Sequence, residues 1–189
     1  LQFLLEGARQ GERVLYVTLS ETQAELELIA KRHGWSLDGI DIFELVTPEA
    51  SLDPELELTV LHPAEIELGE TTRQLFDRVS QTNPSRVVFD SLSEMRLLAQ
   101  SPLRYRRQVL ALKHFFVTGH CTVILLDDQT SEGGNLQLHS ICHGVVMLEQ
   151  QSIDYGAERR RLRVVKMRGI QFRGGYHDAT THSTERNAA

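Results

Sequence analysis

The chain has 189 residues, a formal net charge of −6 and 41% apolar residues, a composition typical of one soluble globular domain. It has no signal peptide and no apolar run near the roughly 20 residues that a membrane-spanning helix needs, so we expect a cytoplasmic protein without membrane contact. Residues 1–100 hold 18 acidic and 8 basic side chains, and the remaining residues hold 8 and 12. The acidity argues against general nucleic-acid binding, which relies on Lys and Arg. The uneven charge fits both head-to-tail association of copies and a merely solvated surface.

The first quarter of the chain predicts two helix–strand pairs. In chain order these are a helix at 1–11, a buried strand at 13–19, a helix at 22–33 and a strand at 40–46. A Thr-x-x-Glu capping box at residues 22–25 marks where the second helix begins. The apolar side chains expected to face the core from the two helices are Leu1, Leu4, Leu5, Ala8, Leu26, Ile29 and Ala30.

The middle of the chain continues the alternation of helices and strands. Three prolines without a clear period indicate a loop at 47–63. The elements that follow are a helix at 64–81, a strand at 86–90, a helix at 101–118 and an apolar strand at 121–126. Ser101 and Pro102 suit the N-cap and the first position of a helix. The side chains expected in the core are Ile66, Leu68, Leu75, Phe76, Val79, Tyr105, Val109, Leu112 and Phe116.

The C-terminal part is rich in predicted strands. A polar loop spans 127–135, and strands are expected at 145–148 and 161–166. The complete order predicts an α/β fold with a mostly parallel sheet flanked by helices, followed by a β-rich C-terminal part. We expect residues 1–178 to form one domain and residues 179–189 to form a disordered tail.

A carboxylate and a hydroxyl residue end the strand at 86–90. Its sequence Arg-Val-Val-Phe leads into Asp90 and Ser91. A buried parallel strand of this kind places its carboxylate at the carboxyl edge of the sheet, where open α/β sheets bind ligands. Asp90 could there help to hold Mg²⁺ beside phosphate groups. A helix N-cap would give the same local pattern.

Glu21 follows another buried strand, at 13–19, by two residues. It would lie beside Asp90 if the two strands are neighbours in the sheet. A carboxylate in that place could act as the general base that activates water for attack on a phosphate. A solvated Glu near the start of a helix, stabilised by the helix dipole, explains the residue equally well.

Lys166 and Arg168 precede Gly169, which allows a sharp turn. Two residues that lie two apart on a strand point to the same face. Two cations on one face suit phosphate recognition, and an Arg supplied by a neighbouring subunit would act as an arginine finger. An exposed basic strand edge is the alternative, and the pattern alone favours it.

Taken together, the sequence resembles the KaiC-like branch of the RecA-type P-loop ATPases. The resemblance covers most of residues 1–178 in the order that the family has. The segments that carry it are residues 1–7 (Leu-Gln-Phe-Leu-Leu-Glu-Gly), 14–22 (Val-Leu-Tyr-Val-Thr-Leu-Ser-Glu-Thr), 30–35, 86–94 (Arg-Val-Val-Phe-Asp-Ser-Leu-Ser-Glu) and 164–169 (Val-Val-Lys-Met-Arg-Gly).

In that family, the helix that matches residues 1–7 directly follows the phosphate-binding loop. No Gly-x-x-x-x-Gly-Lys-Ser/Thr motif occurs in the 189 residues. We therefore expect the sequence to begin just past that loop and to lack the loop and the strand before it. We also expect residues 1–189 alone to bind ATP weakly, because the backbone amides and the Lys of the loop supply much of the phosphate site.

The resemblance implies that ATP and Mg²⁺ bind between the subunits of a homo-oligomeric ring, usually a hexamer, of a regulatory or signalling ATPase. By position, Asp90 matches the Mg²⁺ carboxylate, Ser91 belongs to the nucleotide site, and Glu21 matches a water-activating glutamate. Lys166 and Arg168 match residues that reach the neighbour's nucleotide. KaiC has two adjacent glutamates where this chain has Ser20 and Glu21, which puts the rate of hydrolysis in doubt.

Two other functions remain open from the sequence. A RecA/RadA-like DNA-dependent ATPase would need basic DNA-facing loops, but the loop at 127–135 carries Asp127, Asp128 and Glu132 and no Lys or Arg. A non-catalytic module would keep the fold only as a surface for assembly with other proteins. Some KaiC relatives are autokinases, but the sequence places no phosphoacceptor, and it does not identify a signalling partner.

Overall fold

The computed structural model describes residues 1–45, 63–128, 135–152 and 158–179. The predicted loop at 47–63 and the predicted tail at 179–189 therefore lie almost entirely outside the described residues. The chain divides into two compact units, residues 1–132 and residues 133–189, and each unit is described by itself below.

A parallel sheet of four strands forms the centre of the first unit. The strands are β1 (Val14–Thr18), β2 (Ile40–Glu44), β3 (Arg86–Asp90) and β4 (Thr122–Leu125), in the spatial order β2-β1-β3-β4. β1 and β3 pair in parallel, and their last residues, Thr18 and Asp90, are partners in the register. This arrangement confirms the predicted parallel α/β sheet and makes neighbours of the two strands that precede the candidate carboxylates.

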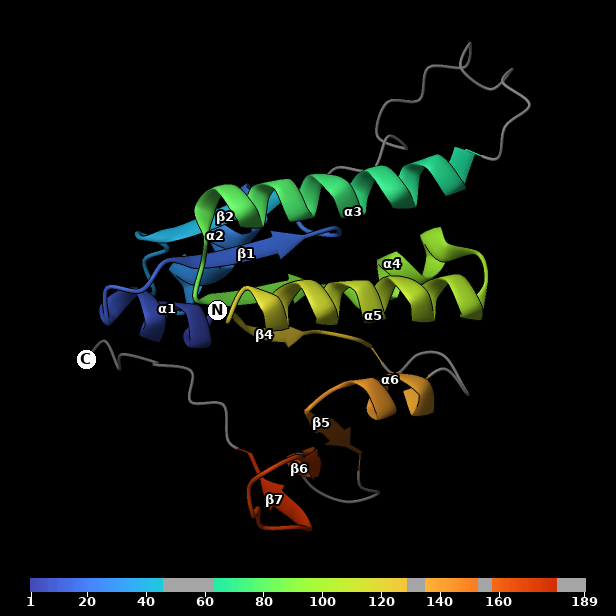
Figure 1. Cartoon of the computed structure of the whole chain (residues 1–189). Coiled ribbons are helices and arrows are strands. Elements are labelled where there is room, and N and C mark those ends of the chain that lie inside the picture. Colours follow the sequence, from blue (N-terminus) through green and yellow to red (C-terminus); the bar gives the residue numbers. More distant parts are fainter. Residues whose placement is uncertain (46–62, 129–134, 153–157, 180–189) are drawn as a thin grey trace. The chain divides into compact units, whose positions relative to one another are not determined.

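Helices cover both faces of this sheet. They are α1 (Gln2–Arg9), α2 (Gln23–Arg32), α3 (Pro63–Thr82), α4 (Leu92–Ala99) and α5 (Pro102–Thr118). One buried cluster joins α1 and α2 to the sheet and consists of Leu4, Val14, Tyr16, Leu26 and Val88. Because side chains alternate along a strand, Leu15 and Val17 point to the opposite face. Figure 1 shows α3 and α5 side by side in front of the strands, where the rings of Phe76 and Phe115 stack with centroids 4.2 Å apart.

α1 lies unusually close to the sheet. A Cβ atom at Gly7 would come within 2.7 Å of Val14 Cγ1 and 2.9 Å of Arg86 Cδ, so only glycine permits this approach. Arg86 also fastens the helix to β3, because its Nε donates to Glu12 Oε2 at 2.7 Å and its guanidinium donates to the carbonyl of Phe3 at 3.1 Å. Val14 and Arg86 are the first residues of β1 and β3, so these contacts fix α1 against the amino ends of the two strands.

The predicted helix caps are confirmed. Thr22 and Glu25 form the complete capping box of α2, and the Ser101 hydroxyl accepts a hydrogen bond from the amide of Arg104 at the start of α5. The prediction that Ile29 faces the core is wrong, since 36% of this residue is exposed. α2 buries only Leu26 and Ala30, which lie on the narrow stripe that touches the sheet.

Two features of the first unit differ from the sequence prediction. α4 was not expected, although Leu92, Met95 and Ala99 are buried at helical spacing. β4 was expected to be an apolar strand, but Ile124 is 38% exposed. The reason is that β4 is an edge strand of the described sheet and its outer side has no strand partner there.

The second unit confirms the predicted β-rich C-terminal part. It contains α6 (Asn135–Ile141) and an antiparallel sheet of β5 (Gly144–Gln151), β6 (Arg159–Met167) and β7 (Tyr176–Asp178). β5 and β6 are longer than the predicted strands, and α6 and β7 were not expected. None of the helices within the described ranges is long and apolar enough to cross a membrane.

Candidate functional site

The carboxyl edge of the parallel sheet brings two predicted site residues together. Asp90 is the last residue of β3, and the chain that leaves β1 continues beside it, because the amide of Leu19 donates to the carbonyl of Asp90 at 2.8 Å. Glu21 follows within two residues. The negative charge of Asp90 helps to raise the pKa of the Glu21 carboxyl group, so the two side chains share one electrostatic environment. We call Glu21 and Asp90 the carboxylate pair.

The buried hydroxyl of Thr18 fixes the turn that carries Glu21. Its Oγ1 accepts hydrogen bonds from the amides of Ser20 at 3.3 Å and Glu21 at 2.9 Å, and it donates to the carbonyl of Glu21 at 2.8 Å. A turn held by three hydrogen bonds to one buried side chain leaves the backbone of Glu21 little freedom. Sequence reasoning missed Thr18, although a Thr at the end of a buried strand is a signal for such a turn.

Burial is the main cause of the raised pKa of Glu21, followed by repulsion from Asp90 and then from Glu25. Each of these effects disfavours the charged carboxylate. A carboxylate with a raised pKa accepts a proton more readily, which suits a general base. The electrostatics are therefore consistent with the role expected for Glu21.

Asp90 makes a short hydrogen bond to a buried tyrosine. The Tyr16 hydroxyl donates to Asp90 Oδ2 at 2.5 Å. Tyr16 lies two residues before Thr18 on β1 and pairs with Val88, so its side chain points to the same face of the sheet as Asp90. Burial and the neighbouring carboxylate raise the pKa of Tyr16 far above its ordinary value, so the hydroxyl remains a donor. Sequence reasoning missed this contact.

The beginning of α1 lies near the carboxylate pair. Leu1 lies close enough to the Asp90 carboxylate for an electrostatic interaction between the two residues. The first amides of a helix carry partial positive charge and can bind an anion. The partial positive charge of the helix and the two carboxylates thus lie in one region. The helix amides suit a phosphate group, and the carboxylates suit the cation that accompanies it.

Ser91 and the end of β4 complete the edge. Ser91 is half-exposed and is the N-cap residue of α4, but its side chain makes no capping hydrogen bond. Asp127 follows the end of β4 by two residues, and its Oδ1 lies 2.6 Å from a guanidinium nitrogen of Arg96 and also accepts from the Ser93 hydroxyl at 3.2 Å. Both partners belong to α4, which therefore holds Asp127.

The second unit holds the two predicted cations. The Lys166 ammonium donates to the backbone carbonyl of His139, and the Arg168 guanidinium donates to that of Ser140 at 2.9 Å. Both side chains therefore reach the last turn of α6, although Arg168 follows the end of β6 at Met167. Gly169 has φ +80°, the left-handed conformation that a sharp turn after them needs.

The residue types at the edge fit Mg²⁺ in the presence of a nucleotide. In the described part of the chain, no group of three or more His, Cys, Asp or Glu side chains could hold a metal ion alone. Mg²⁺ does not require such a cage, because it is commonly bound by one or two carboxylates together with phosphates and water. Asp90 is half-exposed, and the Tyr16 hydroxyl engages only Oδ2, so Oδ1 is the atom that a cation would take.

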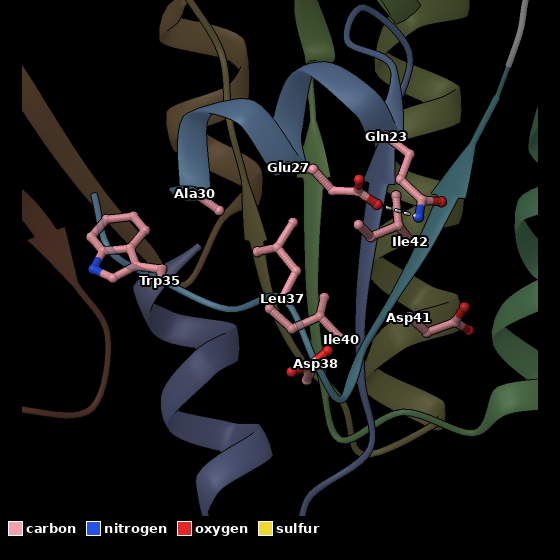
Figure 2. Close-up of a pocket in the computed structure, with 9 residues that line it drawn as sticks. All are labelled: Gln23, Glu27, Ala30, Trp35, Leu37, Asp38, Ile40, Asp41 and Ile42. Atoms are coloured by element: carbon pink, nitrogen blue, oxygen red, sulfur yellow. Dashed lines mark hydrogen bonds between the residues drawn. The ribbon is translucent and has the colours of Figure 1, made fainter. Parts of the chain in front are cut away.

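A separate hollow of about 430 Å³ lies between α2 and β2 (Figure 2). The Gln23 side chain donates to Glu27 within it at 2.8 Å. Figure 2 shows the Asp41 side chain turned away from the other lining residues. This side chain forms an ion pair with Arg78. None of the predicted site residues lines this hollow, so it is not part of the candidate site.

The comparisons with known proteins agree with the geometry. A family model described as the ATPase KaiC matches residues 1–181. The chain is 27% identical to a UPF0273 protein of Pyrococcus furiosus over 98% of this chain and 73% of the relative. It is 24% identical to the circadian clock oscillator protein KaiC of Parathermosynechococcus lividus over 95% of this chain and 34% of that protein.

A solved structure shares the fold. The crystal structure of a KaiC-like protein from Pyrococcus horikoshii matches with a TM-score of 0.70 and 21% identity, over 94% of this chain and 76% of the other. The family match, which covers nearly the whole chain, confirms the resemblance inferred from the sequence. The chain belongs to the KaiC family of RecA-type ATPases.

Proposed function

We propose that this chain forms the hydrolytic part of a KaiC-like regulatory or signalling ATPase that binds Mg·ATP between subunits. The observation that carries the proposal is the carboxylate pair, which lies at the carboxyl edge of two adjacent parallel strands beside the beginning of α1. Open α/β sheets bind ligands at this edge. Membership in an ATPase family supports a nucleotide as the ligand.

The two carboxylates have different environments and, we propose, different tasks. Asp90 would hold the cation through Oδ1, because Tyr16 engages its other oxygen. Glu21 has the raised pKa of a proton acceptor and would orient and deprotonate the attacking water. Bound Mg²⁺ supplies charge neutralisation at the phosphates. Ser91, which follows Asp90 and has a half-exposed side chain, would contact the nucleotide.

We place the phosphate-binding loop, and the strand that precedes it, upstream of Leu1. The 189 residues contain no such loop, and the beginning of α1 lies close to Asp90, where the loop would have to deliver a phosphate. Exposed apolar side chains at the edge strand β4 support a further strand there, since Ile124 in the strand and Leu126 directly after it are 38% and 39% exposed. A strand added at that edge would bury them.

Lys166 and Arg168 would act on the nucleotide of a neighbouring subunit in a homo-oligomeric, hexameric ring. Their side chains bind carbonyl oxygens of α6, which are weaker partners than a phosphate. In the proposed role, both side chains would exchange these carbonyls for phosphate oxygens. An arginine supplied from outside the subunit would stabilise charge that develops in the transition state.

Steady-state ATP hydrolysis by the full-length protein tests the proposal. Asp90→Ala should abolish Mg²⁺-dependent turnover. The matched control is Asp38→Ala, which removes an exposed carboxylate whose side chain binds Ser36 outside the site. Unchanged turnover in Asp90→Ala, with the control also unchanged, would exclude the assignment of Asp90.

A further inference from the structure

We infer that Tyr16 is a positioning residue that orients the Asp90 carboxylate toward the cation through the hydrogen bond from its hydroxyl. The inference rests on the proposed function, because Tyr16 would contact a residue that holds Mg²⁺ and not Mg²⁺ itself. It is carried by the contact of 2.5 Å between Tyr16 Oη and Asp90 Oδ2.

The ring of Tyr16 is held rigidly. The residue is 4% exposed and packs in the cluster of Leu4 from α1, Leu26 from α2 and Val88 from β3. Because protein interiors are close-packed, the surrounding side chains fix the position of the ring and therefore of its hydroxyl group. The hydroxyl therefore acts as a fixed point for the carboxylate that extends from the neighbouring strand.

The register of the sheet explains the direction of the contact. Tyr16 pairs with Val88, and Asp90 lies two residues further along β3 on the same face. The Tyr16 side chain extends from the middle of β1 to the carboxyl edge, where it binds Oδ2. With Oδ2 engaged, the rotation of the carboxyl group is restricted and Oδ1 remains directed to a cation.

Packing also links the Asp90 carboxylate to α1, the helix whose beginning would face the phosphates. Leu4 lies in the first turns of α1 and contributes to the same buried cluster as Tyr16. A shift of α1 would therefore move the ring whose hydroxyl holds Asp90. Hydrogen-bond partners of metal ligands typically change metal affinity by about 10- to 100-fold when they are removed.

The test uses the full-length protein with Tyr16→Phe, which keeps the ring in its cluster and removes only the hydroxyl. The control is Tyr176→Phe, because the Tyr176 hydroxyl also faces a carboxylate, Glu149, at 3.4 Å in the second unit. Binding of a fluorescent, non-hydrolysable ATP analogue is measured at equilibrium against Mg²⁺ concentration and again in EDTA.

We expect Tyr16→Phe to weaken apparent Mg²⁺ binding by about 10-fold and to leave analogue binding in EDTA unchanged. The Tyr176→Phe variant should match the parent protein in both measurements. An unchanged or tighter Mg²⁺ response in Tyr16→Phe, while Asp90→Ala removes the response, would overturn the role of Tyr16 alone. A Mg²⁺ response that survives in Asp90→Ala would instead overturn the proposed function.

Discussion

The two charged regions of the molecule are held in opposite ways. Hydrogen bonds to buried residues fix the carboxylate pair of the first unit. The Tyr16 hydroxyl binds Asp90, and the Thr18 hydroxyl binds the backbone of Glu21. Lys166 and Arg168 of the second unit instead donate to backbone carbonyls of α6. The acidic region is preorganised, whereas the basic region can exchange its partners, which suits a site completed by a neighbouring subunit.

The largest expected effect is a loss of turnover when Arg168, one of the two cations of the second unit, is removed. Arg168→Ala should reduce the turnover number by about 10³-fold, as removal of an arginine finger does. Arg159→Ala, at the other end of β6, is the control and should hydrolyse ATP like the parent protein.

Mixed assemblies decide whether Arg168 acts between subunits. Arg168→Ala and Asp90→Ala proteins are each inactive in this account, but a mixed ring contains interfaces with both intact residues. Hydrolysis should therefore reappear on mixing. Mixtures that stay as inactive as either variant alone, although they co-assemble in mass spectrometry, would contradict action in trans.

A smaller loss of rate is expected at the carboxylate pair. Glu21→Gln removes the proton acceptor but keeps the shape of the side chain, so single-turnover hydrolysis should slow by about 10²-fold or more. Binding of Mg·ATP should persist, since Asp90 and the beginning of α1 are unaltered. Hydrolysis at the parental rate would show that water is activated by another group.

The close approach of α1 to the sheet gives a prediction for stability. Gly7→Ala introduces a Cβ that would lie 2.7 Å from Val14 Cγ1, and overpacking of this kind costs about 1–3 kcal/mol in the free energy of unfolding. Gly69→Ala is the matched control, because it lies within α3 and has no atom within 4 Å of the added Cβ. The control should be neutral or stabilising by up to about 1 kcal/mol. Urea unfolding that ranks the two variants in the opposite order would contradict the packing of α1.

The smallest effect is a pH dependence of stability at Glu21. Its pKa in the folded protein lies above its ordinary value of 4.5. The native state therefore binds more protons than the unfolded state above that pH, and stability decreases as the pH rises through the folded pKa. Glu21→Gln should remove this decrease, which for a partly exposed group amounts to less than about 1 kcal/mol. Parallel pH profiles of urea unfolding for the variant and the parent would contradict the raised pKa.

Periodicity and caps were sufficient to predict most elements of the first unit, because the buried strands and the helix starts depend on local sequence. The proximity of Glu21 and Asp90 could only be stated conditionally, since it depends on which strands are neighbours. Tyr16 was missed for the same reason, as its partner lies across the register of two strands that are far apart in sequence. The exposure of Ile29 and Ile124 also depends on tertiary neighbours rather than on local pattern.

The hydrogen-bond partners of Lys166 and Arg168 could not be predicted from the sequence either. Both contacts are made to α6, a short helix that was not predicted because its seven residues carry too few turns for a clear periodicity. The sequence analysis expected both cations on one strand, whereas β6 ends at Met167 and Arg168 follows it.

Calorimetric titration of the full-length protein with ATP, in the presence and absence of Mg²⁺, is the decisive test of Mg·ATP binding at the carboxylate pair. We expect that ATP binds, that Mg²⁺ strengthens the binding, and that Asp90→Ala removes the effect of Mg²⁺ while ATP still binds. Failure of the full-length protein to bind ATP under either condition would contradict the proposed function and would favour a fold retained only for assembly.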